Sequence, residues 1–567
     1  MLRHSGLFVV LMFAVVVGLS GCGGGGGTAD DPGSSSDEAP LGGVASDGCG
    51  LPVGIPDPAL GAALGNGIDS SIPAAPAAWP GAEAAGYYYV DNTHQAATDA
   101  SNPFGYPDKP RTSIPTQLPA GSLVEVHGGP YAGAKSFVFN GSADAPVYLH
   151  GVGNPRLSGS NIVIGLSGSH ALVDGFVIVG GRLVTSGLSN AAIRDLDVDG
   201  QSTGNLQNGV SLGGTNIVVS GIVSHHHQGD DKHGLTITQG SSNVWVLNSR
   251  FHHNGGDGIQ FCHGCSANPP RNIYIGRNSA YGNRENGFDF KYGENVVLSY
   301  NTAYNHRATQ AGVEFCYDDG SGCTTGSSGS DGASIVIGSD GAPRNFWAIG
   351  NEVYESANGI RVEEAWDGYL IGNIVHGVDA YGIQMEKSGE GPLTIAYNTI
   401  HDVPTCLSGP WQGGPLTTTV ENNIFSECPT RWIGYDQQES ALAVTISNNL
   451  FYNSGGSGVI KLESSSQTHS SGASIDSQVN GGGNMVANPG FVDAGTGNFA
   501  LVSGSPAIDA ATASYTGYQT AFAGAFGNGA NILRDFLGTP RPQGANFDLG
   551  AHEQAAGTAS WCAVTRP

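Results

Sequence analysis

A glycine-centred tripeptide recurs through the middle of the chain at nearly constant spacing. Asn208-Gly209-Val210, His233-Gly234-Leu235 and Asp257-Gly258-Ile259 follow one another at intervals of 25 and 24 residues. A fixed period of this length is the signature of a solenoid, in which every repeat adds one coil and buries its apolar side against its neighbours. The series continues with Asn286-Gly287-Phe288, Ala311-Gly312-Val313, Asn358-Gly359-Ile360 and Tyr381-Gly382-Ile383.

A column of asparagines runs in parallel with the glycines. Short alternating segments such as Val244-Trp245-Val246-Leu247 lie between the two columns, and helical spacing of apolar residues is nearly absent. Asparagine and glycine adopt the left-handed conformation that tight turns need, so they indicate the corners of each coil. The asparagines are Asn243, Asn248, Asn272, Asn278, Asn295, Asn301, Asn345, Asn351, Asn373, Asn398, Asn423 and Asn449.

These patterns predict an all-β fold, a right-handed parallel β-helix over residues 120–460. A propeller and a β-sandwich are the alternatives, but a period of about 24 residues is too short for a four-stranded propeller blade. The 47-residue interval between Gly312 and Gly359 predicts one coil plus an insertion near residues 316–344.

The N-terminus carries the features of a secretory signal. Arg3 precedes an apolar run over residues 7–17, which is shorter than the ~20 residues of a membrane span. The ending Leu19-Ser20-Gly21-Cys22 resembles the lipobox of bacterial lipoproteins. This resemblance implies a signal peptide over residues 1–21, lipid on the sulfur of Cys22, and a bacterial cell-envelope location in which only that lipid contacts the membrane; signal cleavage without lipid is the alternative.

Three further regions flank the repeats. Residues 22–48 are rich in Gly and Ser and predict a flexible tether. Residues 49–119 and 461–567 resemble the N-terminal cap and the C-terminal anchor-associated module of secreted bacterial β-helix proteins. The C-terminal resemblance rests on segments such as Ser505-Pro506-Ala507-Ile508-Asp509, and it implies a cover for the last coil, whose open sheet end would invite aggregation.

The cysteines after Cys22 are even in number, as an oxidising compartment favours. Their positions suggest the local pairs Cys262–Cys265, Cys316–Cys323 and Cys406–Cys428, with Cys49–Cys562 joining the two ends. A Cys262–Cys316 pairing is the alternative to the first two.

The formal net charge of −26 argues against nucleic acid or an anionic membrane as a partner held by nonspecific attraction. An acidic polymer would bind only where a local cation or a basic cluster overrides the overall field. We expect the protein to act as a monomer.

Aligned glycines place outward side chains two and four residues later, and neighbouring coils repeat at ~4.8 Å. The columns are neutral at first and become charged from Asp289 onward, which marks a candidate site; a charged solvated surface is the alternative. The first column is Ser211, Thr236, Gln260, Asp289, Glu314, Arg361 and Gln384, and the second is Gly213, Thr238, Cys262, Lys291, Cys316, Glu363 and Glu386.

A two-coil segment is similar to the calcium site of family 9 pectate lyases. Asp257-Gly258 is followed one coil later by Glu285-Asn286-Gly287-Phe288-Asp289, where the family has an Asp-Gly turn and then Asp-Asp-Gly-Trp-Asp. The resemblance implies a Ca²⁺ ion held by Asp257, Glu285, Asn286 and Asp289, since calcium takes 6–8 oxygen ligands in loose geometry. The family places its catalytic lysine after a glycine of a later coil, where this chain has Glu314.

Lys291 is the lysine of this face nearest the predicted metal, and we interpret it as the base for β-elimination of a uronate polymer. It must lose its proton at a pH well below its reference pKa of about 10.4, which Asp289 opposes unless calcium neutralises it. Arg361 is interpreted as a bidentate holder of a substrate carboxylate. Glu314, counted among the catalytic candidates, and Glu363, Gln384 and Glu386, counted as substrate-binding, complete the set.

Two other functions stay open. A glycoside hydrolase would use paired carboxylates, either Asp289 with Glu314 or Glu363 with Glu386; Asp230-Asp231 does not occupy the outward strand positions of a polygalacturonase pair. A nonenzymatic glycan-binding surface lipoprotein is the second alternative.

A histidine-rich turn, His225-His226-His227 with Asp230, Asp231 and His233, contains metal-binding residue types. We interpret it as a polar coil turn, with zinc or substrate binding as the alternative. His252, His253 and His306 fill matching turns, and one of them would be an alternative base to Lys291.

Overall fold

A computed structural model describes residues 51–554 except 62, 78, 80, 202–206, 339–340, 365, 387–390, 410–416, 436–443, 463–464 and 528, all within one compact unit, Gly43–Pro567. The predicted signal peptide, tether, lipidated Cys22 and Cys49–Cys562 pair lie outside the described residues and stay predictions. In the described part of the chain, no helix has the length and apolar character needed to cross a bilayer.

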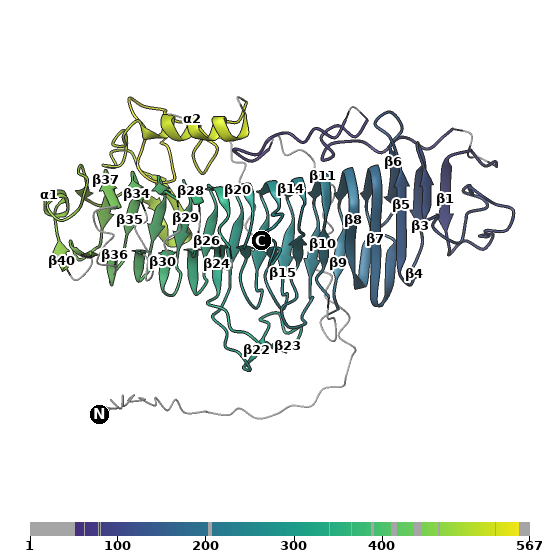
Figure 1. Cartoon of the computed structure of the whole chain (residues 1–567), viewed down its shortest axis with the longest axis horizontal. Coiled ribbons are helices and arrows are strands. Elements are labelled where there is room, and N and C mark those ends of the chain that lie inside the picture. The colour runs from purple at the N-terminus through teal and green to yellow at the C-terminus, as the bar shows by residue number, and fades with distance from the viewer. Residues whose placement is uncertain are drawn as a thin grey trace. The chain divides into compact units, whose positions relative to one another are not determined.

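Each central coil consists of three short strands, and each strand pairs in parallel with its counterpart in the next coil (Figure 1). The strands therefore form three stacks that run from coil to coil. The first stack contains β11 (Gly214–Ser220), β14 (Ser242–Leu247), β17 (Arg271–Gly276), β20 (Glu294–Ser299), β25 (Arg344–Ile349), β28 (Trp366–Ile371), β31 (Leu393–Ala396), β34 (Thr418–Glu421) and β37 (Val444–Ser447).

The second stack follows the first after a turn at each asparagine corner, and the third carries the glycine tripeptides. The second contains β9 (Asp197–Asp199), β12 (Val223–His225), β15 (Arg250–His252), β18 (Ser279–Tyr281), β21 (Thr302–Tyr304), β26 (Glu352–Tyr354), β29 (Ile374–His376), β32 (Thr399–His401), β35 (Ile424–Ser426), β38 (Leu450–Tyr452) and β41 (Met485–Val486). The third contains β10 (Val210–Leu212), β13 (Leu235–Ile237), β16 (Ile259–Phe261), β19 (Phe288–Phe290), β24 (Ala333–Ile337), β27 (Asn358–Val362), β30 (Tyr381–Met385), β33 (Thr405–Ser408), β36 (Arg431–Tyr435) and β39 (Gly458–Leu462).

The first coils are less regular, and β7 and β8 are much longer than the strands of the central coils. The stack starts where β1 pairs in parallel with β3, and β7 pairs with β8 over most of their lengths. These strands are β1 (Tyr87–Asp91), β2 (Gln117–Pro119), β3 (Leu123–His127), β4 (Tyr131–Ala132), β5 (Lys135–Asn140), β6 (Val147–Gly151), β7 (Arg156–Asp174) and β8 (Val177–Arg194).

The interior is filled by alternate residues of every strand. Phe288 and Phe290 of β19 are completely buried, and Phe290 meets Phe261 of the preceding coil edge-on at 4.7 Å. Because the side-chain period of a strand is two, burying these residues leaves Asp289 on the outward side, as the sequence predicted.

A ladder of buried asparagine side chains runs through the corners between the first and second stacks. Asn351 Oδ1 accepts from both the backbone N–H and the side-chain Nδ2 of Asn301, at 3.0 Å each. Asn351 Nδ2 in turn donates to Leu298 O at 3.0 Å and to Asn373 Oδ1 at 2.9 Å. Each asparagine thus satisfies buried groups of two other coils, which fixes their register. The same pattern links Asn278, Asn301, Asn351, Asn373, Asn398, Asn423, Asn449 and Asn484.

One insertion leaves the coil between β21 and β24. β19 pairs directly with β24, so Asp289 lies beside Val336 and not beside Glu314. Glu314 and Cys316 instead belong to an antiparallel hairpin, β22 (Glu314–Cys316) with β23 (Cys323–Thr325). The predicted columns are therefore wrong at these two positions, because Val336 and Gly338 occupy them.

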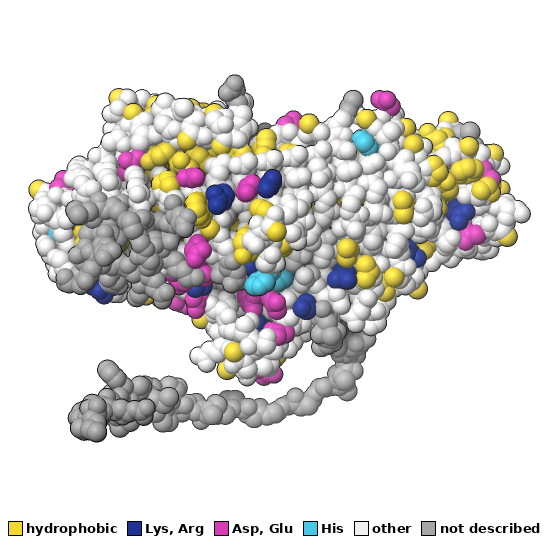
Figure 2. All heavy atoms as spheres, in the orientation of Figure 1, with side chains coloured by type: hydrophobic (Ala, Val, Ile, Leu, Met, Phe, Trp, Pro, Cys, Tyr) yellow, Lys and Arg dark blue, Asp and Glu magenta, His cyan; other side chains and the backbone are white. Residues whose placement is uncertain are grey.

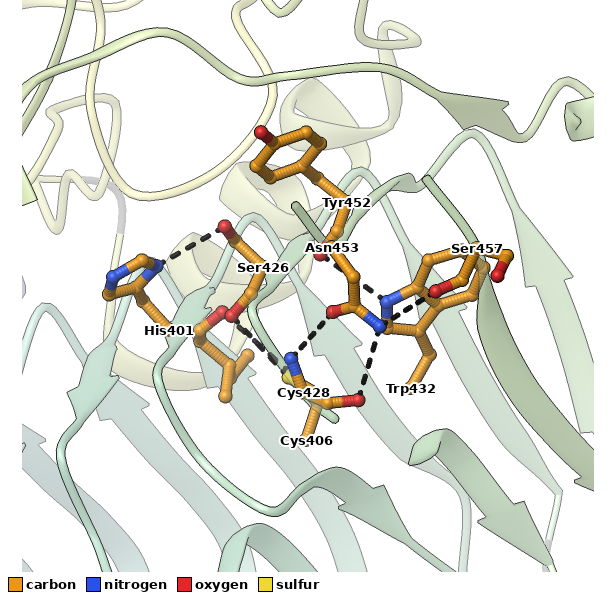
Figure 3. The surroundings of a disulfide bond; sticks show 9 residues. His401, Cys406, Ser426, Cys428, Trp432, Tyr452, Asn453 and Ser457 are labelled. Atoms are coloured by element: carbon orange, nitrogen blue, oxygen red, sulfur yellow. Dashed lines mark hydrogen bonds between the residues drawn. A yellow bond between two sulfur atoms is a disulfide. The ribbon is translucent and has the colours of Figure 1, made fainter. Parts of the chain in front are cut away.

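Three disulfides connect the predicted local pairs, Cys262–Cys265, Cys316–Cys323 and Cys406–Cys428. Figure 3 shows the last of them inside the late coils, where Asn453 Oδ1 accepts from the N–H of Cys428 at 2.8 Å. Trp432 Nε1 donates to Tyr452 O nearby at 3.4 Å. This bridge therefore links consecutive coils at a place where the backbone is also held by side chains.

Segments from both ends of the chain cover the outward face of the first stack. Leu60 and Leu64 pack there with Trp245, whose Nε1 donates to Pro56 O at 2.8 Å. Helix α2 (Ser514–Phe526) lies against later strands, with Phe522 edge-on to Trp347 at 4.9 Å (Figure 1). Consequently these segments cover parts of this face.

The last coil is covered by residues that directly follow it. β40 (Ser465–His469) pairs in antiparallel fashion with β39, and helix α1 (Gly472–Asp476) packs beside it. The remaining elements, β42 (Phe491–Asp493), the 3-10 turn η2 (Ala494–Thr496) and β43 (Asn498–Leu501), precede α2.

The ladder generates a stability prediction. Replacing Asn351 by Leu removes the acceptor of the buried Asn301 N–H, so we expect the free energy of unfolding to fall by roughly 2–4 kcal/mol. Urea unfolding followed by tryptophan fluorescence measures this. Asn295→Gly is the control. The Asn295 side chain makes a similar contact to the preceding coil but is half-buried, and its φ of 57 is one that glycine adopts without strain. The free energy of unfolding should therefore fall by less than about 1 kcal/mol. Equal losses in the two variants would contradict a special role for the buried ladder.

Candidate functional site

A pocket of about 680 Å³ lies on the outward side of the third stack. The insertion forms one wall through residues 327–331, and the strands of successive coils form the other. The lining combines carboxylates with a lysine and an arginine, so the pocket holds charges of both signs. Its residues are Asp231, Gln260, His263, Glu285, Asn286, Asp289, Lys291, Ser327, Ser328, Gly329, Ser330, Asp331, Val336 and Arg361.

Asp289 and Lys291 form an ion pair inside this pocket. They stand two residues apart and on the same outward side of the third stack, and Lys291 Nζ donates to Asp289 Oδ2 at 2.9 Å. The side chains are only 5% and 11% exposed, so solvent screens the pair weakly. A carboxylate this close favours the protonated amine.

Asp257 lies behind the pocket wall and is completely buried. Its Oδ1 accepts from the backbone N–H and the Nδ2 of Asn286 at 3.0 and 2.9 Å. Its Oδ2 accepts from Gln260 Nε2 at 3.0 Å and faces the His233 ring at 3.3 Å. Asp257 therefore joins two coils and positions Asn286 and Gln260 at the pocket.

Asn286 is also committed to coil stacking. Its Oδ1 accepts from the N–H of Ala333 at 3.1 Å and from Ser330 Oγ at 3.2 Å. The second contact ties the insertion to the coil, so Asn286 helps to set the position of the pocket wall.

Glu285 lines the pocket and is buried. Its Oε1 accepts from Arg284 Nη1 at 2.9 Å and from Ser328 Oγ at 3.4 Å. Burial, and then the nearby Asp257 carboxylate, raise the pKa of Glu285 to about 8 although Arg284 opposes the shift. Burial thus favours the protonated form of Glu285, while the Asp289 carboxylate contacts Lys291 Nζ at 2.9 Å.

The predicted calcium ligands do not fit an ion as they stand. Asp257 and Asn286 use their oxygens in contacts between coils. Among the described residues, clusters of three or more acidic, histidine or cysteine ligand atoms within 4.8 Å of one another occur elsewhere, and none contains Glu285 or Asp289. We therefore assign no step below to calcium.

Arg361 enters the pocket two coils beyond Asp289, as predicted. Its Nη1 contacts Asp331 Oδ2 at 3.0 Å, while Nη2 contacts Glu363 Oε1 at 3.0 Å and Glu386 Oε2 at 2.7 Å. Gln384 Nε2 donates to Glu386 Oε1 at 3.3 Å. The predicted substrate-binding residues Glu363, Gln384 and Glu386 thus gather around Arg361 and fix its direction, but they do not line the pocket.

Glu314 does not join the site. It is exposed on β22, away from the third stack, because the insertion begins before it. The hydrolase pair Asp289 with Glu314 is therefore excluded by the strand order. The alternative pair, Glu363 and Glu386, shares one guanidinium nitrogen, so both carboxylates are occupied by Arg361.

The histidine candidates for a base lie elsewhere. His306 is completely buried, and burial lowers its pKa to about 3. His252 is also buried, and its pKa is lowered well below the ordinary value by burial and by neighbouring histidines. His252, His253 and His306 do not line the pocket, so Lys291 stays the candidate base among these residues.

Sequence reasoning missed the wall of the pocket. Asp331 and the serines before it come from the insertion, and Asp231 comes from a coil turn two coils before Asp289. The signal available was the Gly- and Ser-rich run at residues 324–332, which predicts a loop but not the surface that the loop covers.

Comparisons with known proteins bear on the fold. A family model described as "Right handed beta helix region" matches residues 319–475. The fold is a right-handed parallel β-helix. A comparison of the sequence with curated proteins finds no match.

Solved structures with similar coordinates include a pectate lyase, Pel9A, at 15% identity and TM-score 0.38, covering 82% of this chain and 96% of that one. The A-module of the Azotobacter vinelandii mannuronan C-5 epimerase AlgE4 is 16% identical with a TM-score of 0.34, covering 66% and 88%. A tailspike protein of E. coli bacteriophage HK620 in complex with a pentasaccharide is 13% identical with a TM-score of 0.38, covering 60% and 65%. At these TM-scores the likeness says nothing of the chemistry.

The raised pKa of Glu285 generates a prediction about stability. The folded state holds a proton on Glu285 up to about pH 8, whereas an unfolded glutamic acid releases it near 4.5, so the free energy of unfolding should fall as the pH rises through this window. Glu285→Gln cannot ionise and should flatten that slope. Urea midpoints measured between these pH values check this, with Glu294→Gln at the surface pair with Arg271 as the control. Parallel curves for wild type and Glu285→Gln would refute the assignment.

Proposed function

We propose that this chain is a polysaccharide lyase that cleaves an acidic, uronate-containing polymer by β-elimination. The observation that carries the proposal is the arrangement of Lys291, Asp289 and Arg361 on the outward side of one sheet, facing one pocket. β-Elimination requires a charge partner for the sugar carboxylate and a base for the proton beside it. Arg361 offers a guanidinium as the charge partner, and Lys291 offers an amine as the base.

The pocket cations also answer the objection raised by the net charge of −26. Long-range repulsion opposes a polyanion, so binding has to depend on short contacts in a place where solvent is largely excluded. Lys291 and Arg361 are 11% and 17% exposed, which makes such contacts stronger than they would be at the surface. A neutral polysaccharide would gain nothing from them.

Arg361 is the proposed holder of the substrate carboxylate. Two of its three carboxylate partners, Glu363 and Glu386, have side chains only 9% and 23% exposed, but Asp331 is 57% exposed. A uronate carboxylate would therefore replace Asp331 on Nη1 at the lowest cost, because Asp331 can turn into water. The other two carboxylates keep the guanidinium plane in position.

Lys291 is the proposed base. It must act as the neutral amine, and Asp289 at 2.9 Å opposes this. Deprotonation is therefore favoured at alkaline pH, and the neutral amine would take the proton from the carbon beside the bound carboxylate. The bond from the next carbon to the glycosidic oxygen would then break, and the leaving oxygen would take its proton from the new ammonium group or from water. Asp289 orients Nζ of Lys291 in the pocket, but its negative charge also opposes the loss of the lysine proton.

A glycoside hydrolase is the second candidate, and one observation favours it. Glu285 and Asp289 line the same pocket, and burial raises the pKa of Glu285 to about 8, which favours its protonated form. Two carboxyl groups with different protonation states are the usual acid and nucleophile or base of glycosidases. The reaction would then need Glu285 and not Lys291.

The first experiment separates these functions. Purified protein is incubated with polygalacturonate, alginate and a sulfated uronate polymer, and both ultraviolet absorbance of unsaturated uronates and new reducing ends are recorded. Absorbance with reducing ends supports the lyase, reducing ends alone support the hydrolase, and retention on the polymer without cleavage supports a binding protein. A parallel arm with calcium chelator tests the predicted calcium dependence.

A substitution of the base gives the second test. Lys291→Ala should lower lyase turnover by about 10²–10⁴-fold, since a positioned base contributes that much. Lys461→Ala is the matched control, because Lys461 occupies the outward column of Asp289 in a late coil. Circular dichroism confirms folding of both variants. A Lys291→Ala enzyme with near-normal turnover would remove the assigned base, whichever reaction the first experiment finds.

The pH profile of lyase activity gives the third test. Asp289→Asn removes the charge that favours protonated Lys291, so the pH of half-maximal kcat/KM should move down by about one unit or more. Measuring kcat/KM against pH for both proteins checks this. An unchanged profile in the variant would mean that the group titrating in the rate is not Lys291.

A further inference from the structure

Two histidines on successive coils lie side by side at the base of the β22–β23 hairpin. His226 follows β12 and His253 follows β15, and both adopt the left-handed conformation at φ 57 and 53. Their rings stack at 5.6 Å with an interplanar angle of 18°. Figure 2 shows histidine and acidic side chains gathered where the hairpin meets the coils.

The neighbouring histidines determine which ring nitrogens face the hairpin. Nδ1 of His226 lies 2.6 Å from Nδ1 of His225, and Nδ1 of His253 lies 2.8 Å from Nδ1 of His252. Each Nδ1 pair shares a single proton. The Nε2 atoms of His226 and His253 are thereby directed to the hairpin.

The hairpin meets these nitrogens with two aspartates. Asp319 Oδ2 lies 2.8 Å from His226 Nε2 and 3.5 Å from His253 Nδ1. Asp318 Oδ1 lies 2.9 Å from His253 Nε2. Ligand atoms of His226, His253 and Asp319 all lie within 4.8 Å of one another.

The carboxylates are held in place before any ligand binds. The Cys316–Cys323 disulfide closes the loop that contains both. The N–H of Ser321 donates to Asp319 Oδ1 at 2.9 Å, and Asn305 Nδ2 donates to Asp318 Oδ2 at 2.6 Å. Each aspartate thus has one oxygen fixed by the protein and the other directed to a histidine.

The contacts of His225 and His226 need more protons than the two neutral rings carry. Asp197 Oδ1 contacts His225 Nε2 at 2.9 Å, His225 contacts His226, and His226 contacts Asp319. These three contacts each need a proton, but two neutral imidazoles bring only two. One contact must therefore contain an added proton or a metal ion.

We propose that His226, His253 and Asp319 bind a divalent transition-metal ion of the zinc class. Imidazole nitrogen with carboxylate oxygen suits zinc in a tetrahedral site and does not suit calcium. With the ion on His226 Nε2, the two imidazole protons satisfy the remaining contacts, His226 to His225 and His225 to Asp197. That chain is the outer support that metal-bound histidines require.

The ion would tie the insertion to the coils. Residues 327–331 follow β23 directly and line the pocket. A ligand from the hairpin and two from the coils would therefore fix the wall of the pocket, independently of which reaction occurs inside it.

The test uses the full chain, stripped with chelator and dialysed. Zn²⁺ is titrated by calorimetry, and Co²⁺ is added to read the visible bands of a tetrahedral nitrogen–oxygen site. Wild type should bind one tight equivalent of Zn²⁺ and give the Co²⁺ bands. Asp319→Asn, which keeps the volume of the side chain, and His226→Ala should each weaken binding by about 10-fold or more.

His376→Ala is the control, because His376 lies in the ring stack of His225 and His252, four coils beyond His252, and is paired with Glu352 at 3.4 Å. Its affinity for Zn²⁺ should equal that of wild type. Binding that survives both Asp319→Asn and His226→Ala, or that Ca²⁺ displaces equally well, would show adsorption to acidic surface groups and overturn the proposal. If His226→Ala does not fold, the Asp319→Asn affinity and its Co²⁺ spectrum decide alone.

Discussion

Hydrogen bonding between consecutive coils is the constraint on which the other features depend. Parallel strands supply most of it, but the corners would leave polar backbone groups buried without partners. The asparagine ladder solves this problem, since Asn351 satisfies groups of its neighbours on both sides. Because every rung has the same geometry, the coils stay in register, and outward side chains are placed above one another at the repeat of a β-sheet.

This register survives the insertion, which explains how a site could be built there. Asn301 and Asn351 are 50 residues apart in sequence and still pair as adjacent rungs. The intervening hairpin therefore leaves the pairing of these rungs intact. Ser330 donates a hydrogen bond to Asn286 where the insertion rejoins the coil. The solenoid supplies a rigid row of charged side chains, and the loop supplies a wall that encloses them.

Repeat counting predicted much of this from the sequence. The alternation of Phe288 and Phe290 with Asp289 and Lys291 requires that the charged pair face outward. The glycine register places Arg361 in the column of Asp289 and Glu386 in the column of Lys291. Glu314 was assigned wrongly because Ala311-Gly312-Val313 imitates a repeat inside the insertion, while the true coil has Ser334 in the glycine position and an apolar outward Val336. The burial of Asp257 could not be foreseen either, since it precedes its strand and alternation does not determine its direction.

Both cations of the pocket have carboxylate partners before any ligand arrives. Lys291 contacts Asp289, and Arg361 contacts three carboxylates, so a ligand has to exchange with an internal partner rather than fill an empty place. Exchange favours a ligand that brings its own carboxylate, because a neutral sugar would leave a buried cation without its counter-charge. It also favours replacement at Asp331, whose side chain can return to water. Because both cations are already paired, an acidic polymer would have to replace an internal carboxylate, and the insertion contributes Asp331, the most exposed of these partners.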